Sequence, residues 1–217
     1  MKLSSVKNPR VQHAYALRER KQRETERLTV LEGYRELSRA MDAGVKLSEC
    51  FFCPEMFLGS NEAALLERAQ GQGAELFETT PEVLTKLAYR DRPEGLIAVS
   101  AIRSHTLAEM PAKKDGLYLV AETIEKPGNL GSLLRSADAA GATGVIVCDK
   151  RTDIYNPNVI RASTGAIFSM PLAETSSEEA HKWLKSLGIA ILSATPHATA
   201  VHSDSDMKQG VAIVVGA

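Results

Sequence analysis

The residues most able to do chemistry lie in a segment that directly follows an apolar run near position 121. Asn129, Gly131 and Arg135 stand there in the pattern N-x-G-x-x-x-R. We predict that Asn129 caps a helix whose apolar face packs on a sheet; that face comprises Leu130, Leu133, Leu134 and Ala137. A helix amino terminus attracts anions, and a guanidinium can bind a phosphate through two hydrogen bonds. Arg135 lies off the apolar stripe, so the segment suits a phosphate-bearing ligand such as an RNA backbone.

Each of these residues also has a purely structural interpretation. Asn129 is explained by helix capping alone, Arg135 by a surface ion pair, and Gly131 by a close approach of helix and strand. The segment is neither a dinucleotide-binding glycine fingerprint nor a Walker loop ending in Lys-Ser/Thr, so NAD and ATP lack their motifs here.

The cysteines and histidines do not predict a metal site. Cys50, Cys53 and Cys148 are an odd number without framework spacing, which is typical of a reducing compartment. Cys50 and Cys53 are three apart on an expected strand and so point to opposite faces, as small buried hydrophobes. The five histidines are scattered; His197 and His202 share a loop, but no carboxylate or cysteine completes a ligand set.

Two α/β units are needed to position these groups. Apolar runs alternate with helical patterns up to residue 102, with expected helices at 8–26, 33–43, 61–70 and from 81, and strands at 28–31, 50–53, 74–77 and 96–102. Residues 103–116 are polar and form the expected linker. Residues 117–217 predict a parallel, doubly wound sheet, with strands at 117–121, 145–148, 189–194 and 211–215 and helices at 130–140, 157–162 and 177–186.

Composition excludes disordered, collagenous and disulfide-scaffold classes, because 44% of the residues are hydrophobic and 24% are charged. The charge is unevenly spread: residues 1–27 contain eight Lys/Arg and three Glu, although the whole chain has a net charge of −1. This basic end favours either a polyanionic partner or a solvated helix face. The uncharged stretch 186–203 is too polar for a membrane span, and no secretory signal is present, so we expect a cytoplasmic protein without a membrane partner.

Several segments, in order, resemble the SpoU/TrmH family of RNA 2′-O-ribose methyltransferases of the SPOUT superfamily. The pattern from Asn129 to Arg135, followed by 139–142 and a strand, resembles the first family motif. Residues 161–166, with Phe168 and Pro171, resemble the segment that follows it, and 214–217 resemble the start of the second motif. Residues 1–102, with the Glu32-Gly33 turn, resemble the ribosomal-protein-like substrate-binding domain of many members. The resemblance therefore spans nearly the whole chain.

The resemblance implies methyl transfer from S-adenosylmethionine to a ribose 2′-OH of structured RNA, either rRNA or tRNA, by a homodimer. It implies an RNA substrate-binding domain at 1–102 and a methyltransferase domain at 117–217 with a deep trefoil knot. Carried over by position, the catalytic residues are Asn129 and Arg135. The cofactor-binding residues are Thr195, Pro196, Gly216 and Ala217. The expected RNA contacts are Lys7, Arg10, Arg18, Arg135, Arg161 and Ser163.

The chain departs from the family at its carboxyl end. Members continue past the Gly-Ala step with a Glu, a Gly-Leu sequence and a third motif containing Ser and Asn, which complete the knot and most of the adenosyl pocket. We therefore expect a truncated domain with little cofactor affinity. Two alternatives stay open: a non-catalytic module that binds structured RNA, and an α/β protein that binds a small phosphate-bearing molecule at Asn129.

Overall fold

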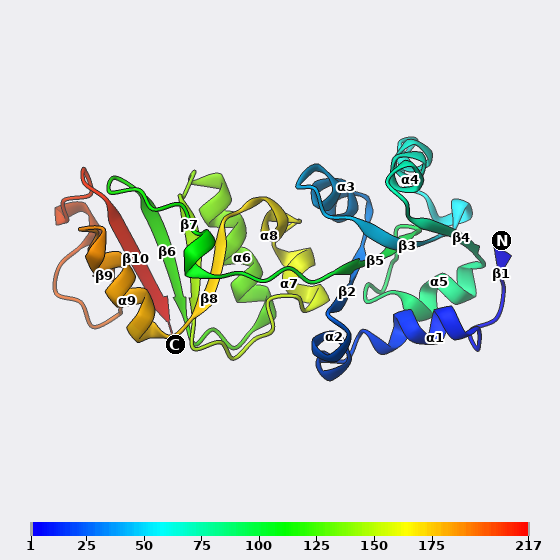
Figure 1. Cartoon of the computed structure of the whole chain (residues 1–217), viewed down its shortest axis with the longest axis horizontal. Coiled ribbons are helices and arrows are strands. Elements are labelled where there is room, and N and C mark those ends of the chain that lie inside the picture. The colour runs from blue at the N-terminus through cyan, green and yellow to red at the C-terminus, as the bar shows by residue number, and fades with distance from the viewer. Residues whose placement is uncertain (1, 217) are drawn as a thin grey trace. The chain divides into compact units, whose positions relative to one another are not determined.

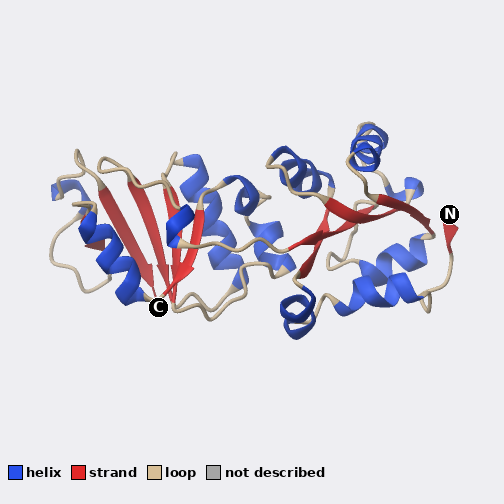
Figure 2. Ribbon diagram, in the orientation of Figure 1, coloured by secondary structure: helices blue, strands red, loops and turns tan. Residues whose placement is uncertain are grey.

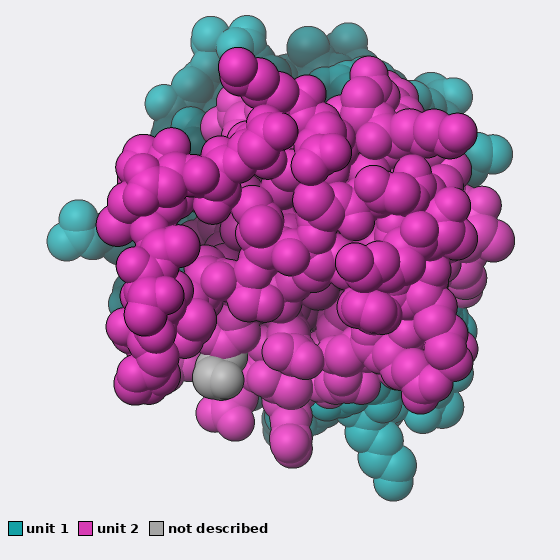
Figure 3. Space-filling model, turned by 90° about the vertical axis from the view of Figure 1, so that its left-hand side faces the viewer, with its two compact units in different colours: residues 1–103, 155–169 teal, residues 104–154, 170–217 magenta. Residues whose placement is uncertain are grey.

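The computed structural model describes residues 2–216, and the chain forms two compact units (Figures 1 and 3). Unit 1 comprises residues 1–103 and 155–169, and unit 2 comprises residues 104–154 and 170–217. The expected linker begins where the first segment of unit 1 ends. The spatial division differs from the sequence division because residues 155–169 pack in unit 1: the Thr29 hydroxyl donates to the Tyr155 carbonyl at 2.9 Å. A cut along the sequence cannot detect such a return of the chain.

Unit 1 is built on a mixed five-stranded sheet in the order β1-β4-β3-β5-β2. Its strands are β1 (Lys2–Leu3), β2 (Leu28–Glu32), β3 (Leu47–Phe52), β4 (Glu75–Thr79) and β5 (Leu96–Ala101). Strands β1, β4 and β3 are parallel, whereas β5 is antiparallel to both β3 and β2. The predicted α/β class is confirmed, but the two-residue β1 is too short to show a sequence pattern.

Alternate residues of each strand divide the core of unit 1 between the two faces of this sheet. One face packs against α1 (Pro9–Ala16) and α5 (Pro81–Leu87), and the other against α3 (Tyr34–Asp42) and α4 (Glu62–Gly71). The returning segment adds α7 (Pro157–Ala162) and α8 (Ala166–Ser169). Cys53 is buried in the first cluster and Cys50 in the second, so the two thiols lie on opposite faces, as predicted.

The predicted basic helix over 8–26 is wrong in one respect, because the chain forms two helices there. Helix α1 ends at Ala16, and α2 (Arg20–Glu26) starts after an extended Glu19. Arg23 explains the break: its side chain is 1% exposed, and its Nη1 donates to the carbonyls of Leu17 and Arg18. Carbonyls at the end of a helix need such donors. Arg23, which the sequence pattern places on a solvated helix face, is therefore a buried structural residue.

Unit 1 also buries two carboxyl groups beside one guanidinium. Glu36 is 3% exposed and accepts a hydrogen bond from Arg90 Nη2 at 2.9 Å; Glu32 is 7% exposed and accepts from the backbone N–H of Tyr89 at 2.7 Å. The second oxygen of each carboxyl has no hydrogen-bond partner among the described residues. Burial raises the pKa of Glu36 and of Glu32, and the charge of Arg90 only partly opposes it.

This cluster predicts that unit 1 loses stability as the pH rises above 4.5, the ordinary pKa of a Glu. The native state holds its proton to a higher pH than the unfolded chain, so ionisation favours unfolding; each unit of raised pKa costs about 1.4 kcal/mol once the group is ionised. Glu36→Gln should flatten this decline between pH 5 and 7. Urea unfolding followed by far-ultraviolet circular dichroism measures it, with the exposed Glu67→Gln as the control. Parallel pH profiles for wild type and Glu36→Gln would contradict the prediction.

Unit 2 is built on a five-stranded, wholly parallel sheet in the order β8-β7-β6-β10-β9. Its strands are β6 (Leu117–Glu122), β7 (Gly144–Cys148), β8 (Leu172–Thr175), β9 (Ala190–Ser193) and β10 (Val211–Gly216). The predicted parallel sheet is confirmed. Strand β8 was not predicted, since four residues are too few to show a period; its pairing with β7 defines it. The knot implied by the resemblance stays a prediction.

Two helices flank the sheet of unit 2. Helix α6 (Pro127–Ala139) packs against β6 and β7, and α9 (Ser177–Ser186) packs against β7 and β9 (Figures 1 and 2). The core beneath α9 includes Tyr118, Ile146, Ala180 and Leu184. Trp183 lies beside it, with its ring centroid 5.3 Å from that of Tyr118 in an edge-on arrangement. Within residues 2–216, no helix has both the length and the apolar content needed to cross a bilayer.

Candidate functional site at the carboxyl edge of unit 2

All five strands of unit 2 run in one direction, so their carboxyl ends meet at one edge of the sheet (Figure 2). The strand order reverses between β6 and β10, where Glu122 pairs with Gly216. In open α/β sheets, ligands bind outside the carboxyl ends of the strands at such a switch point. This topology makes the edge around Glu122 and Gly216 the candidate site.

Helix α6 begins at this edge, and four residues separate it from the end of β6. The predicted cap was misplaced: Lys126 is the N-cap and makes no side-chain cap hydrogen bond, Pro127 opens the helix, and Asn129 lies in its first turn. Proline favours the first helical position because it lacks an N–H that would stay unpaired there. Asn129 therefore has an exposed side chain that is not used for capping.

Arg135 is exposed, as predicted, while Leu130, Leu134 and Ala137 are buried against the sheet. Six residues separate Asn129 from Arg135, which places them about 9 Å apart along the axis and about 120° apart around it. The structure therefore does not bring these two side chains to one point. Together with the exposed Ser132 between them, they form an inclined polar ridge along α6 that suits an extended ligand better than a single anion.

The predicted cofactor residues lie at the same edge. Ser193, the last residue of β9, pairs with Val214. Thr195 follows two residues after the end of β9, and Gly216 is the last residue of the neighbouring β10. Thr195 and Pro196 are exposed in a turn in which the Thr195 hydroxyl accepts a hydrogen bond from the His197 N–H at 3.3 Å. A Cβ on Gly216 would stand 3.3 Å from the Glu122 carbonyl oxygen, so glycine keeps the backbone accessible there. Ala217 lies outside the described residues.

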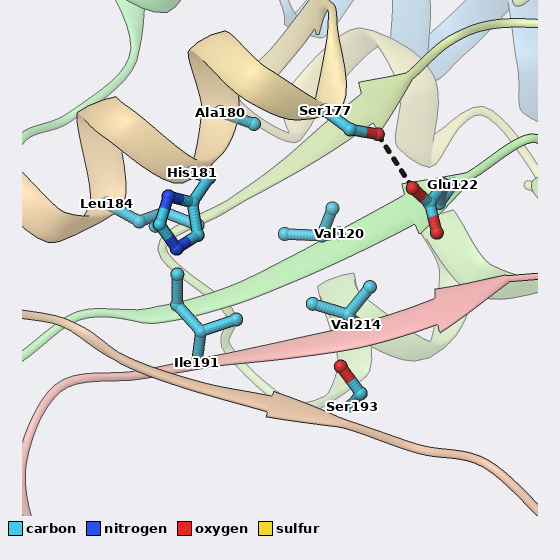
Figure 4. A pocket seen from close by; sticks show the side chains of 9 residues that line it. All are labelled: Val120, Glu122, Ser177, Ala180, His181, Leu184, Ile191, Ser193 and Val214. Carbon is cyan, nitrogen blue, oxygen red and sulfur yellow. Dashed lines mark hydrogen bonds between the residues drawn. The ribbon is translucent and has the colours of Figure 1, made fainter.

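Two hollows flank this corner of the sheet. One, of about 220 Å³, lies between α9 and strands β6, β10 and β9; Figure 4 shows Glu122 and Ser177 at one end and Val120, Val214 and Ile191 along its length. The second, of about 440 Å³, is lined by β9, by Ile213 and by the loop that contains Thr195, His202 and Met207. Apolar walls with a few polar groups are typical of small-molecule sites.

Sequence analysis did not single out three polar side chains at this edge. The Ser177 hydroxyl lies 2.8 Å from Glu122 Oε1 and 2.6 Å from Asp149 Oδ2, and the Ser177 N–H donates to the same Asp149 oxygen at 3.1 Å. These bonds lower the pKa of Asp149, the side-chain bond contributing most. A hydroxyl has one proton, so Ser177 donates to one carboxylate at a time. Their positions in the sequence could have indicated this cluster, because Glu122 directly follows one predicted strand and Asp149 directly follows the next.

The basic residues predicted to bind RNA differ in their surroundings within unit 1. Lys7 and Arg161 are exposed, and Arg161 donates to Asn158 Oδ1 at 3.1 Å. The Arg18 guanidinium lies 4.3 Å from the ring centroid of Tyr89 and 5.1 Å from that of Tyr15. Lys7, Arg18 and Arg161 therefore have their charged groups at the surface of unit 1 or against aromatic rings.

Arg10 and Ser163 are held by structural contacts instead. Arg10 forms ion pairs with Glu49 at 2.6 Å and Glu75 at 3.1 Å, and its guanidinium lies 4.6 Å from the Phe77 ring centroid. Ser163 is fully buried, and its hydroxyl donates to the Ile160 carbonyl at 2.8 Å. Arg10 thus ties α1 to β3 and β4, and Ser163 completes the end of α7. Ser163 is therefore inaccessible to RNA in this conformation, unlike the expectation from the sequence. The Arg10 side chain is 41% exposed, so its RNA contact stays a prediction.

Family models match both halves of the chain. Residues 116–217 match the SpoU rRNA methylase family, and residues 8–98 match the MRM3-like substrate binding domain. The two matches flank the expected linker at 103–116.

Individual relatives carry names of the same kind. The chain is 28% identical over 191 residues to a 23S rRNA (uridine(2479)-2′-O)-methyltransferase of Streptomyces viridochromogenes, an alignment that covers 85% of this chain and 66% of that protein. It is 39% identical to a solved RNA 2′-O ribose methyltransferase, with a TM-score of 0.86 over 100% of this chain and 81% of the other. A SpoU methyltransferase of Streptomyces viridochromogenes, solved with AdoMet, is 27% identical with a TM-score of 0.85, over 97% and 81%.

Proposed function

The chain belongs to the SpoU/TrmH family of RNA 2′-O-ribose methyltransferases, and on this premise we propose that it methylates a ribose 2′-OH of ribosomal RNA with S-adenosylmethionine as the methyl donor. The observation that carries the proposal is the joint position of the α6 amino end and Gly216 at the switch point of a parallel sheet. The relatives named above act on rRNA or RNA, which favours rRNA over tRNA.

The proposal assigns the RNA substrate to unit 1 and the chemistry to unit 2. Asn129 and Arg135 orient the target nucleotide along the exposed ridge of α6. Arg135 stays protonated at neutral pH, so it does not act as a base. Its role is to hold the adjoining phosphate and to stabilise the negative charge that develops on the 2′-oxygen. The proton of the hydroxyl passes to phosphate or water.

The residues present fit the methyl donor. Thr195 lines the hollow of about 440 Å³, and Gly216 ends β10, the strand whose Ile213 also lines it. We propose that Thr195, Pro196, Gly216 and Ala217 hold the cofactor. Bound there, S-adenosylmethionine supplies an electrophilic methyl group. Leu192, Ile213 and Met207 give the hollow apolar side chains that suit an organic ligand.

The proposal also includes a cytoplasmic location and a homodimer formed through unit 2. Three free, buried cysteines support a reducing compartment. Burial raises the pKa of the Cys50 thiol to about 12 and that of Cys148 to about 11, so both thiols stay protonated and suit a structural role. Light scattering after size exclusion measures the oligomeric state.

Titration calorimetry with S-adenosylmethionine tests the proposal most directly, followed by transfer of a labelled methyl group to rRNA transcripts. For the protein as its gene encodes it, we expect cofactor binding and RNA-dependent incorporation of the label. The labelled product should resist alkaline hydrolysis, since a methylated 2′-oxygen cannot attack the adjoining phosphate. Gly216→Val should abolish cofactor binding in the calorimeter, because the branched valine side chain would cover the backbone that glycine leaves accessible. An unchanged circular dichroism spectrum is the control for folding. RNA binding without cofactor binding would instead favour the non-catalytic RNA-binding module.

A further inference from the structure

Two aromatic rings and two cations meet where α1 and α5 end in unit 1. Arg18 lies over the rings of both Tyr89 and Tyr15, at 4.3 and 5.1 Å, and Lys86 Nζ lies 4.2 Å from the Tyr15 ring centroid. Tyr15 and Tyr89 are half-buried, and Lys86 is exposed. These four residues are called the tyrosine platform below. They come from two helix ends that pack together in unit 1.

The cations of the platform are not neutralised within the protein. Among residues 2–216, neither Arg18 nor Lys86 forms an ion pair, whereas Lys2, Arg10, Arg68 and Arg90 each pair with a carboxylate. A cation over a ring at an exposed site gains little free energy from that contact, so its charge stays available to a further partner. The platform therefore combines positive charge that no carboxylate neutralises with two half-buried aromatic rings.

Hydrogen bonds to buried groups hold the backbone beneath the platform. The Arg18 carbonyl accepts hydrogen bonds from the Tyr89 hydroxyl at 2.8 Å and from the buried Arg23 at 2.6 Å. The Tyr89 N–H donates in turn to the buried Glu32. Burying a guanidinium and a carboxyl costs free energy, and here both groups fix the two residues whose side chains stack at the surface. A binding site gains affinity when its contact groups are ordered before the ligand arrives.

We propose that the tyrosine platform is the RNA-contact surface of unit 1 and that it binds an unpaired, splayed-out nucleotide. The base stacks on Tyr15 in the place that the Lys86 ammonium takes in the free protein, and Lys86 and Arg18 turn to hold the adjoining phosphates. Tyrosine rings and guanidinium planes are the usual stacking partners of unstacked RNA bases, and Lys and Arg neutralise the backbone. This inference rests on the proposed function, since it requires an RNA substrate. It gives Arg18, one of the basic residues of the amino-terminal segment, a defined place in that RNA contact.

The test measures binding of the full chain to two fluorescent RNA probes of equal length, a hairpin with a single-stranded loop and a perfect duplex. Tyr15→Leu should weaken hairpin binding about tenfold and leave duplex binding unchanged, because only the unpaired bases stack. Tyr15→Phe should bind the hairpin as the wild type does. Lys86→Gln should weaken the binding of both probes and reduce the slope of log K against log salt concentration by about one unit. Lys46→Gln, at another exposed lysine, is the matched control.

Each failure has a distinct meaning. Equal weakening of both probes by Tyr15→Leu, or no weakening of either, would overturn the platform while leaving the proposed methylation intact. If the wild type binds neither probe at low salt, the proposed function fails together with the platform. Thermal unfolding of Tyr15→Leu checks the fold, and Lys86→Gln gives a second, exposed variant that leaves the core untouched.

Discussion

Replacing Arg135 by alanine is expected to reduce the rate constant of methyl transfer by about 100-fold or more, while S-adenosylmethionine binds as before. The reason is electrostatic: loss of one donor to a developing oxyanion typically costs 10²–10³ in rate. Arg135 is exposed on α6 and its neighbours Leu134 and Ala137 carry the packing, so the fold should survive. Single-turnover methylation of rRNA by the protein as its gene encodes it measures the effect.

Two further variants make this result specific. Arg135→Lys keeps a charge but loses the planar pair of donors, so it should recover only part of the rate. Lys185→Ala removes an exposed cation from the last turn of α9 and should leave methylation unchanged. Undiminished methylation by Arg135→Ala with intact folding would remove Arg135 from the proposed site.

Gly210→Ala is expected to destabilise unit 2 by about 3 kcal/mol, because it overfills a site bounded by backbone. A Cβ at Gly210 would stand 2.0 Å from the Lys114 carbonyl oxygen and 2.5 Å from Ile189 Cδ1. The chain cannot move aside easily: the Gly210 carbonyl accepts from the Ala190 N–H, and the Val211 N–H donates to the Gly116 carbonyl. Relief of the clash would shift β10, the strand that carries Gly216.

The single tryptophan makes this measurable, since Trp183 packs beside the core of unit 2 and reports its urea unfolding by fluorescence. Gly128→Ala is the control for stability, because a Cβ there meets nothing within 4 Å. A midpoint for Gly210→Ala equal to that of the wild type would show that the strand accommodates the methyl group.

The sequence alone was enough to predict the α/β class, the parallel sheet of unit 2 and the family. These follow from local signals: apolar runs of four to six residues, helical spacing of Leu130, Leu134 and Ala137, and a motif whose residues are close along the chain. It also predicted that Cys50 and Cys53 lie on opposite faces of one sheet, since side chains on a strand alternate. The assigned roles of Asn129, Arg135, Thr195, Pro196 and Gly216 stay predictions.

Tertiary structure decided the features that depend on contacts distant in sequence. Whether a basic residue is free or paired depends on what packs beside it. The sequence does not distinguish Arg10, Arg18 and Arg23. In the fold, Arg10 pairs with Glu49, Arg23 is buried and Arg18 lies over Tyr89. The return of residues 155–169 to unit 1 depends on contacts such as that of Thr29 with Tyr155. The meeting of Glu122, Asp149 and Ser177 at one edge depends on the order of the strands. The charge and the apolar periodicity of a segment can be determined from its sequence. The desolvation and the ion pairs of its side chains arise only when segments distant in sequence come into contact.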